Sequence, residues 1–128
     1  MKATHKIHSD KGYVHITFEG SITLPELGAH IQTVWSDKAW RTHFGGIIDC
    51  SAATLDISDV EIQELTKGMM KDPRCSFAKW AFVVSTAADF AKFRQVNHVV
   101  EVKSNLRIFF DLRSAKGWLL AKEKKSAR

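Results

Sequence analysis

The spacing of apolar residues changes at Gly20, and this change constrains the fold more than any other feature of the sequence. Before Gly20, Val14, Ile16 and Phe18 alternate with polar neighbours, as in a strand that buries one face. After Gly20, apolar residues recur every three or four positions, as in an amphipathic helix: Leu27, Ile31, Val34 and Trp35. A chain that changes period in this way pairs strands with helices, so we expect an α/β fold.

The same patterns predict five strands and about four helices. A hairpin of His5–Ser9 and Tyr13–Glu19 turns at Asp10-Lys11-Gly12, and further strands are expected at Ile47–Cys50, Trp80–Val84 and Leu106–Phe110. Capping residues indicate where the helices begin: Thr23, Ser58, Thr86 and Asp111. Strands alternate with helices after the hairpin. This order predicts a single-layer mixed five-stranded sheet, with an antiparallel N-terminal hairpin and then parallel β-α-β units.

Burial should differ between the strands. Trp80–Val84 is a continuous apolar run and is expected to be buried on both faces. The second hairpin strand should expose one polar face that carries Tyr13, His15 and Thr17, and this face or the hairpin edge would permit a homodimer. Helical stripes supply the rest of the core: Ile62, Leu65 and Met69 before Pro73; Phe90, Phe93, Val96 and Val100; Ala115, Trp118 and Leu119.

Length and composition indicate one ordinary globular domain. The chain has 128 residues, 45% hydrophobic and 26% charged, and we expect residues 1–121 to fold and the basic residues 122–128 to fray. It contains no apolar run near the roughly 18 residues of a membrane span, and its first residues lack the apolar core of a signal peptide. We therefore expect a cytoplasmic protein.

The net charge of +5 would allow a nucleic-acid partner, but its distribution does not favour one. Much of the excess lies between Lys116 and Arg128, where a basic tail is usually only solvated. No basic stripe alternates with exposed aromatic residues. Specific nucleic-acid binding is not expected.

Gly45 to Glu61 reads as a short apolar strand, a polar turn and the start of a helix, the junction where α/β proteins often place a site. Ser58 and Glu61 have the spacing of a capping box, and Asp59 adds negative charge where the helix dipole favours it. Capping explains Ser58 without any modification. Phosphorylation of Ser58 is the alternative, because phosphate suits a helix N-terminus.

Three segments together resemble the SpoIIAA-like proteins of the STAS/SEC14 type over nearly the whole chain. They are Gly20-Ser-Ile-Thr before a helix, Ile47-Ile48-Asp49, and Phe109 followed by Ala115 and Trp118-Leu119. The resemblance implies a mixed sheet flanked by helices, with no established catalytic residues. Its relatives include anti-sigma-factor antagonists, which carry a phosphorylatable serine and bind a kinase, and SEC14-type proteins, which enclose apolar ligands.

The antagonist motif aligns imperfectly with this sequence. The motif is Asp-x-Ser, a short loop and then Asp-Ser-Ser-Gly, and here it corresponds to Asp49-Cys50-Ser51 and Asp56-Ile57-Ser58-Asp59. Isoleucine stands at the phosphoacceptor position and Asp59 at the glycine, while Ser58 follows one position later. A phosphorylation switch is therefore not the expected mechanism.

Other catalytic or metal-binding patterns are weak. Asp49, Asp56 and Asp59 resemble a divalent-cation set, but turn and cap roles explain them. His5 and His8 should point to opposite faces of a strand, and no histidine pair has metal-ligand spacing. Nothing in the sequence brings Cys50 to His98 as a nucleophile and its base. We expect no metal and no cofactor.

The sequence thus favours a non-enzymatic STAS-like domain that binds a protein partner or a small apolar ligand. The expected contact residues lie at the start of the second helix and on the third helix: Asp56, Ser58, Asp59, Phe90 and Phe93. The alternative is a carrier of lipid or another hydrophobic metabolite, with the ligand under the aromatic residues and the third helix as a cover.

Overall fold

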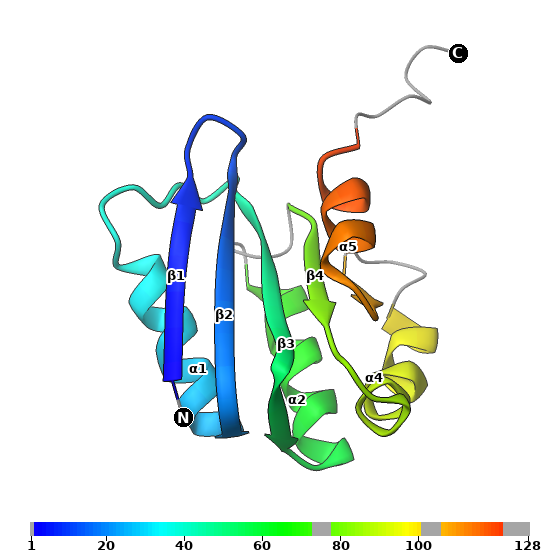
Figure 1. The fold of residues 1–128 in the computed structure, drawn as a ribbon. Coiled ribbons are helices and arrows are strands. Elements are labelled where there is room, and N and C mark those ends of the chain that lie inside the picture. Colours follow the sequence, from blue (N-terminus) through cyan, green and yellow to red (C-terminus); the bar gives the residue numbers. More distant parts are fainter. Residues whose placement is uncertain (1, 73–77, 101–105, 122–128) are drawn as a thin grey trace.

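A computed structural model describes residues 2–72, 78–100 and 106–121, which form one five-stranded sheet with helices on both faces (Figure 1). Side chains of Met70 and of residues 94–100 are outside this description. In chain order the elements are β1 Lys2–His8, β2 Tyr13–Thr23, α1 Leu24–Trp35, β3 Gly45–Asp56, α2 Asp59–Lys71, β4 Trp80–Val83, α4 Ala87–Val100, β5 Leu106–Phe109 and α5 Leu112–Leu119.

The strands lie side by side in the order in which the chain makes them, β1-β2-β3-β4-β5. β1 pairs with β2 in antiparallel fashion, and the other three pairs are parallel. Right-handed crossovers that always step in one direction place their helices on one face. Accordingly, α1, α2 and α4 supply residues to one core, and α5 packs on the opposite face.

The predicted fold class is confirmed. The protein is an α/β fold with an antiparallel N-terminal hairpin, a mixed sheet and four helices in the described part of the chain. This arrangement is compatible with a STAS-like fold. None of the helices that the structure describes has the length and apolar character needed to cross a membrane.

β2 and β3 are longer than predicted, and the polar turn expected after Cys50 is wrong. β3 runs on to Asp56 because β2 also continues, through Gly20 to Thr23, and the two extensions pair in parallel. The register shifts between Thr17 and Glu19, where β3 has one extra residue. Gly20 takes φ 83°, a conformation that favours glycine.

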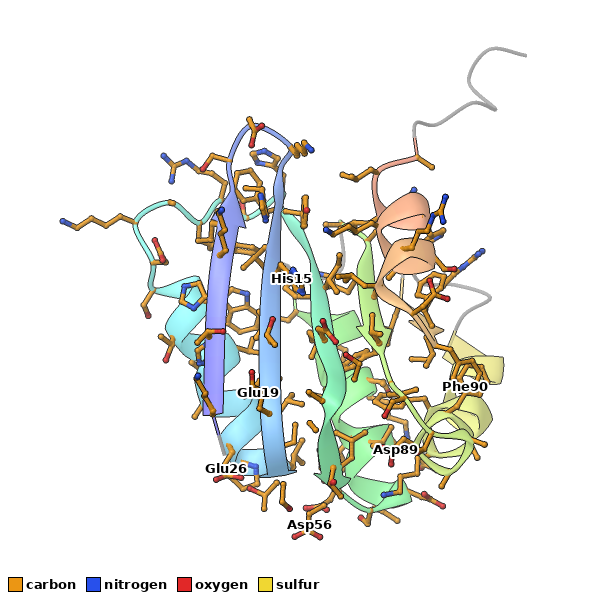
Figure 2. All side chains as sticks on the ribbon, in the orientation of Figure 1. His15, Glu19, Glu26, Asp56, Asp89 and Phe90 are labelled. Atoms are coloured by element: carbon orange, nitrogen blue, oxygen red, sulfur yellow. The ribbon has the colours of Figure 1, made fainter. Side chains whose placement is uncertain are left out.

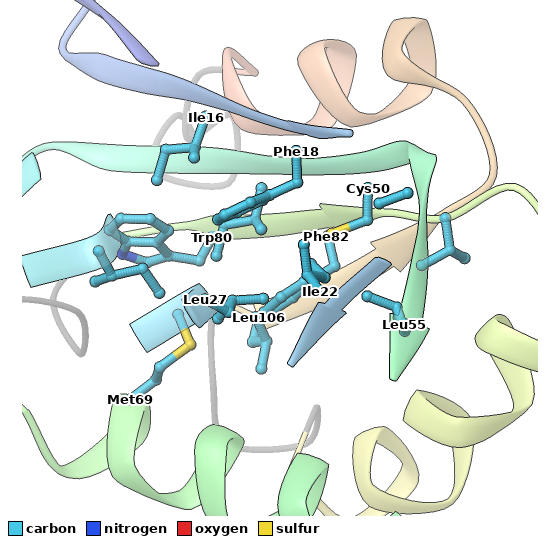
Figure 3. Close-up of a cluster of buried hydrophobic side chains, with 14 of the residues drawn as sticks. Ile16, Phe18, Ile22, Leu27, Cys50, Leu55, Met69, Trp80, Phe82 and Leu106 are labelled. Carbon is cyan, nitrogen blue, oxygen red and sulfur yellow. The ribbon is translucent and has the colours of Figure 1, made fainter. Parts of the chain in front are cut away.

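The main core lies between the sheet and the helices α1, α2 and α4 (Figure 3). Its fully buried side chains include Phe18 and Ile22 from β2 and Trp80 and Phe82 from β4. The alternate residues of β4, Ala81 and Val83, are buried in the second core under α5. β4 is therefore buried on both faces, as predicted.

The expected polar face of β2 is only partly exposed, and the prediction for Tyr13 is wrong. Tyr13 is 4% exposed and packs with Ile47, Val83 and Ala115 in the second core. α5 returns over this end of the sheet, which spacing within β2 does not reveal. Burial, with a further contribution from Asp10, raises the pKa of the Tyr13 hydroxyl.

Several expectations fall outside the described residues. They are the helix stop at Pro73, the inward positions of the Val96 and Val100 side chains, the His98 side chain, and the fraying of residues 122–128. In the described part, α2 ends at Lys71 and the backbone amide of Asp72 closes its last turn.

Candidate functional site

The connection between β3 and α2 lies at the carboxyl edge of the sheet and contains residues predicted to contact a partner. β3 ends at the exposed Asp56, and only Ile57 and Ser58 separate it from α2. The Glu61 amide donates to Ser58 Oγ at 3.2 Å, and the Ser58 amide donates to Glu61 Oε1 at 2.9 Å. The predicted capping box is present and fixes the start of α2.

Ile57, at the position aligned with the antagonists' phosphoacceptor, is 3% exposed and belongs to the main core. It anchors the connection between β3 and α2. Ser58 is exposed, and its Oγ serves as the cap acceptor. A phosphate on Ser58 would displace that contact and lie beside the carboxylates of Asp56 and Asp59.

The structure brings the start of α4 to the same edge. Lys92 Nζ donates to the Leu55 carbonyl at 3.0 Å, which links α4 to the end of β3. The same ammonium lies 3.9 Å from Asp89 Oδ1, and the Asp89 amide donates to Thr86 Oγ1 at 3.0 Å. Figure 2 shows Asp56, Asp89 and Phe90 along this edge. Two segments that are about thirty residues apart in the sequence therefore contribute to one surface.

The two phenylalanines predicted for this surface have different positions. Phe90 stacks on Phe110, with ring centroids 4.5 Å apart and an interplanar angle of 11°. Phe110, which follows β5, is 52% exposed. Phe93 packs against Phe82 in the main core at 4.7 Å and is not on the surface. Phe110 was not among the predicted contact residues, because a phenylalanine at the end of a strand is usually buried.

Val60 adds a second exposed apolar group at the edge. It lies in the first turn of α2 and is 62% exposed. The exposed Asp59 precedes it, and the half-buried Glu61 follows it. We define the carboxyl-edge surface by the following residues: Asp56, Ser58, Asp59, Val60, Phe90 and Phe110. This surface presents apolar side chains beside acidic ones.

A cluster of hydrogen-bonded polar side chains lies on the sheet face that carries α5. His15 Nε2 is 3.3 Å from Asp49 Oδ2, and Ser51 Oγ donates to Asp49 Oδ1 at 2.6 Å. Burial raises the pKa of Asp49, but the hydrogen bonds from His15 and Ser51 outweigh it, and the net pKa is lowered. A carboxylate with a lowered pKa is a poor general base. The Ser51 hydroxyl contacts Asp49 and not the imidazole, so this group does not have the order of a nucleophilic triad.

The main face carries a histidine pair that sequence analysis missed. His5 Nδ1 of β1 lies 3.2 Å from His30 Nε2 of α1, and His5 Nε2 lies 3.1 Å from Asp37 Oδ2. Burial and the neighbouring His5 lower the pKa of His30. A backbone hydrogen bond from Ala39 and a side-chain bond from His5 lower the pKa of Asp37. In the sequence, His5 and Ile7 are two positions apart, which predicts that both side chains lie on the same face of the strand. The contact between His5 and α1 can be recognised only from the fold.

Cys50 is suited to packing and not to nucleophilic chemistry. It is completely buried, and burial, together with Asp49 and Asp89, raises the pKa of its thiol to about 12. A thiol with this pKa carries almost no thiolate at neutral pH.

The three carboxylates considered for a cation do not form one site. Asp49 is engaged within the sheet, whereas Asp56 and Asp59 lie exposed at its edge. Among the residues that the structure describes, no group of three or more histidine, cysteine, aspartate or glutamate side chains has an arrangement able to hold a metal ion.

Comparison with known proteins gives no further assignment. No protein-family model matches the chain, and no curated protein matches it. The function must therefore be argued from the site.

Proposed function

We propose that the protein is a non-enzymatic, STAS-like binding domain of the SpoIIAA-like kind, which engages a protein partner through the carboxyl-edge surface. The proposal depends most on the Phe90–Phe110 stack, in which a large aromatic side chain remains 52% exposed. Aromatic side chains held rigidly at a surface are frequent energetic centres of protein interfaces. No catalytic residue is part of the proposal.

The chemistry of the surface favours a partner segment that is both apolar and basic. Val60 and Phe110 offer apolar contact, and Asp56 and Asp59 offer negative charge on a chain whose net charge is +5. Opposite charge at the rim of an interface speeds association and selects the partner. The capped α2 and the Lys92 link hold these groups in place before binding, which lowers the entropic cost of association.

The carrier alternative requires space between the helices and the sheet. Under α4 that space is occupied, because Phe93 packs on Phe82 with ring centroids 4.7 Å apart. The start of α4 is also fixed to β3 through Lys92. These contacts favour the protein-binding proposal over an apolar ligand enclosed under α4.

Photo-crosslinking in the source cell tests the proposal. Benzoylphenylalanine at position 110 should give a discrete adduct with one protein, and the same group at the exposed Thr42, near the opposite edge, should not. With the identified partner purified, Phe110→Ala should weaken binding at least about tenfold. Leu120→Ala is the matched control, because Leu120 is also an exposed apolar residue but lies outside this surface.

Two results would refute the proposal. One is an adduct pattern at position 110 that is no different from that at position 42. The other is an equal loss of affinity for Phe110→Ala and Leu120→Ala.

A further inference from the structure

A groove of about 340 Å³ lies between α1 and α2, on a different part of the molecule from the carboxyl-edge surface. Its volume is within the range of small-molecule sites, roughly 300–1,000 Å³. Apolar side chains from both helices line it, among them Ile31 of α1 and Leu65 and Met69 of α2. The groove is open to solvent along the two helices, so a ligand can enter without movement of the sheet.

Each helix places a glycine in this groove. A Cβ atom on Gly28 or on Gly68 would meet no other atom within 4 Å, so neither glycine is required by close packing. Neither has a positive φ, so neither is required by backbone conformation. Glycine inside a helix is less stable than alanine. What the two glycines provide in return is open space on facing sides of one groove.

The charge of the groove is of one sign. Its ionisable lining residues in the described part of the chain are Glu64 and Asp72, both acidic, although the chain carries a net charge of +5. Lys67 and Lys71 belong to the same helix and are exposed, but they do not line the groove. An apolar floor with carboxylates at its rim is complementary to a ligand that has an apolar body and a cationic end.

We propose that this groove binds a small amphiphilic amine. The apolar chain lies along Ile31, Leu65 and Met69, over the two glycines, and the ammonium group lies at Glu64. A fatty acid of the same length places a carboxylate at the same rim, where like charge opposes it. The site thus selects by charge among ligands whose apolar chains have equal length.

An NMR titration of the full chain with octylammonium, octanol and octanoate tests this inference. Octylammonium should shift the backbone amide signals of Gly28 and Gly68 in a saturable way, with higher affinity than octanol. Octanoate should bind most weakly. Glu64→Gln should reduce the affinity for octylammonium about fivefold and leave that for octanol unchanged, as expected for an ion pair with an exposed carboxylate.

A filling substitution provides the second measurement. Gly68→Leu places a side chain in the open groove and should abolish saturable binding while the helix remains folded. Gly117→Leu is the matched control, because Gly117 lies in α5 and a Cβ there would also meet no atom within 4 Å. It should leave the titration unchanged.

Three outcomes would overturn the proposal. Binding of octanoate as tight as that of octylammonium would remove the role of the carboxylates. Full binding by Gly68→Leu would place the ligand elsewhere. The signals of both glycines should not change when the protein concentration is varied without any amine. If they do change, the occupant of the groove is a second copy of the chain. Since this groove is separate from the carboxyl-edge surface, failure of either proposal leaves the other intact.

Discussion

The two faces of the sheet differ in how completely helices cover them. On one face, α1, α2 and α4 pack over a large apolar core that extends from β2 to β5. On the other, α5 is the one helix within the described residues that packs on the sheet, over a small cluster around Tyr13, Ile47 and Val83. Beyond α5 that face remains polar, with the exposed Glu19, Ser21 and Thr54 on neighbouring strands.

This difference follows from topology. Strands added in one direction with right-handed crossovers place every connecting helix on the same side. The opposite side is then left to a helix that follows the last strand, and α5 has only 8 residues. Stability should therefore depend mainly on the first face, and the following predictions test this from the largest expected effect to the smallest.

Phe82→Ala should reduce the free energy of unfolding by about 3–5 kcal/mol, because it leaves a cavity in the main core. Phe82 is completely buried and packs against Phe93. Urea unfolding followed by circular dichroism measures the change. A loss below about 1 kcal/mol would show that the main core is not the chief source of stability.

Trp118→Ala should cost about 2 kcal/mol, less than Phe82→Ala, because Trp118 is only half-buried on the α5 face. Its ring packs on Phe109 at 5.7 Å, and Lys79 Nζ and the Arg107 guanidinium each lie 5.3 Å from the ring centroid. The same urea measurement applies. If this loss equals or exceeds that of Phe82→Ala, the proposed inequality of the two faces is wrong.

His30 on the main face and Asp49 on the other face should lose stability in different pH windows. His30 lies on the main face, and its pKa is lowered from 6.5. As the pH falls, the unfolded chain therefore binds a proton at this histidine before the folded protein does. The contribution of His30 to the free energy of unfolding is complete above pH 6.5. It decreases as the pH falls from 6.5 toward the pKa of His30 in the folded protein. Asp49 on the other face has a pKa below 3.8, so its contribution is present above 3.8 and is lost as the pH falls further.

Substitutions can assign each pH window to its residue when the free energy of unfolding is measured from about pH 8 to pH 2. His30→Gln keeps a donor toward His5 and should reduce the upper window only, which His8 shares because its pKa is also lowered. Asp49→Asn should reduce the lower window only, which Asp37 and Asp111 share because their pKa values are also lowered. A wild-type curve that stays flat as the pH falls below 6.5 would contradict the assignment to His30.

Ser21→Lys should change stability by less than about 0.5 kcal/mol, because Ser21 is exposed on the part of the sheet that α5 does not cover. Ile22→Ser is the matched control: the next residue of β2 is completely buried in the main core, and its loss should be severe. Comparable effects of the two substitutions would show that this part of the sheet is covered by something else, such as a second copy of the chain.

Patterns within single elements were predictable because they depend on neighbours in the sequence. The capping boxes at Thr23 and Ser58 and the double burial of β4 are of this kind. The extension of β3 from Ser51 to Asp56 was not, since its polar residues form a strand only because β2 offers a parallel partner. Pairing across elements replaced the local preference for a turn.

The candidate site divides in the same way. Asp56, Ser58 and Phe90 could be named from the sequence, because strand ends and helix starts mark the carboxyl edge. The helical stripe predicted that Phe93 faces the core, and this is confirmed, so Phe93 is not part of the surface to which it was also assigned. Phe110 entered the site only through its stack with Phe90, a contact between α4 and the end of β5.

By itself, the sequence determined the order of strands and helices, the hairpin, the helix starts and the α/β class, because period and capping are local properties. Tertiary structure decided which side of the sheet each helix covers, that His5 meets His30, and that Tyr13 is buried under α5. It also decided that Gly28 and Gly68 line one groove. These features depend on the crossover direction and on how distant segments pack, and no window of neighbouring residues contains that information.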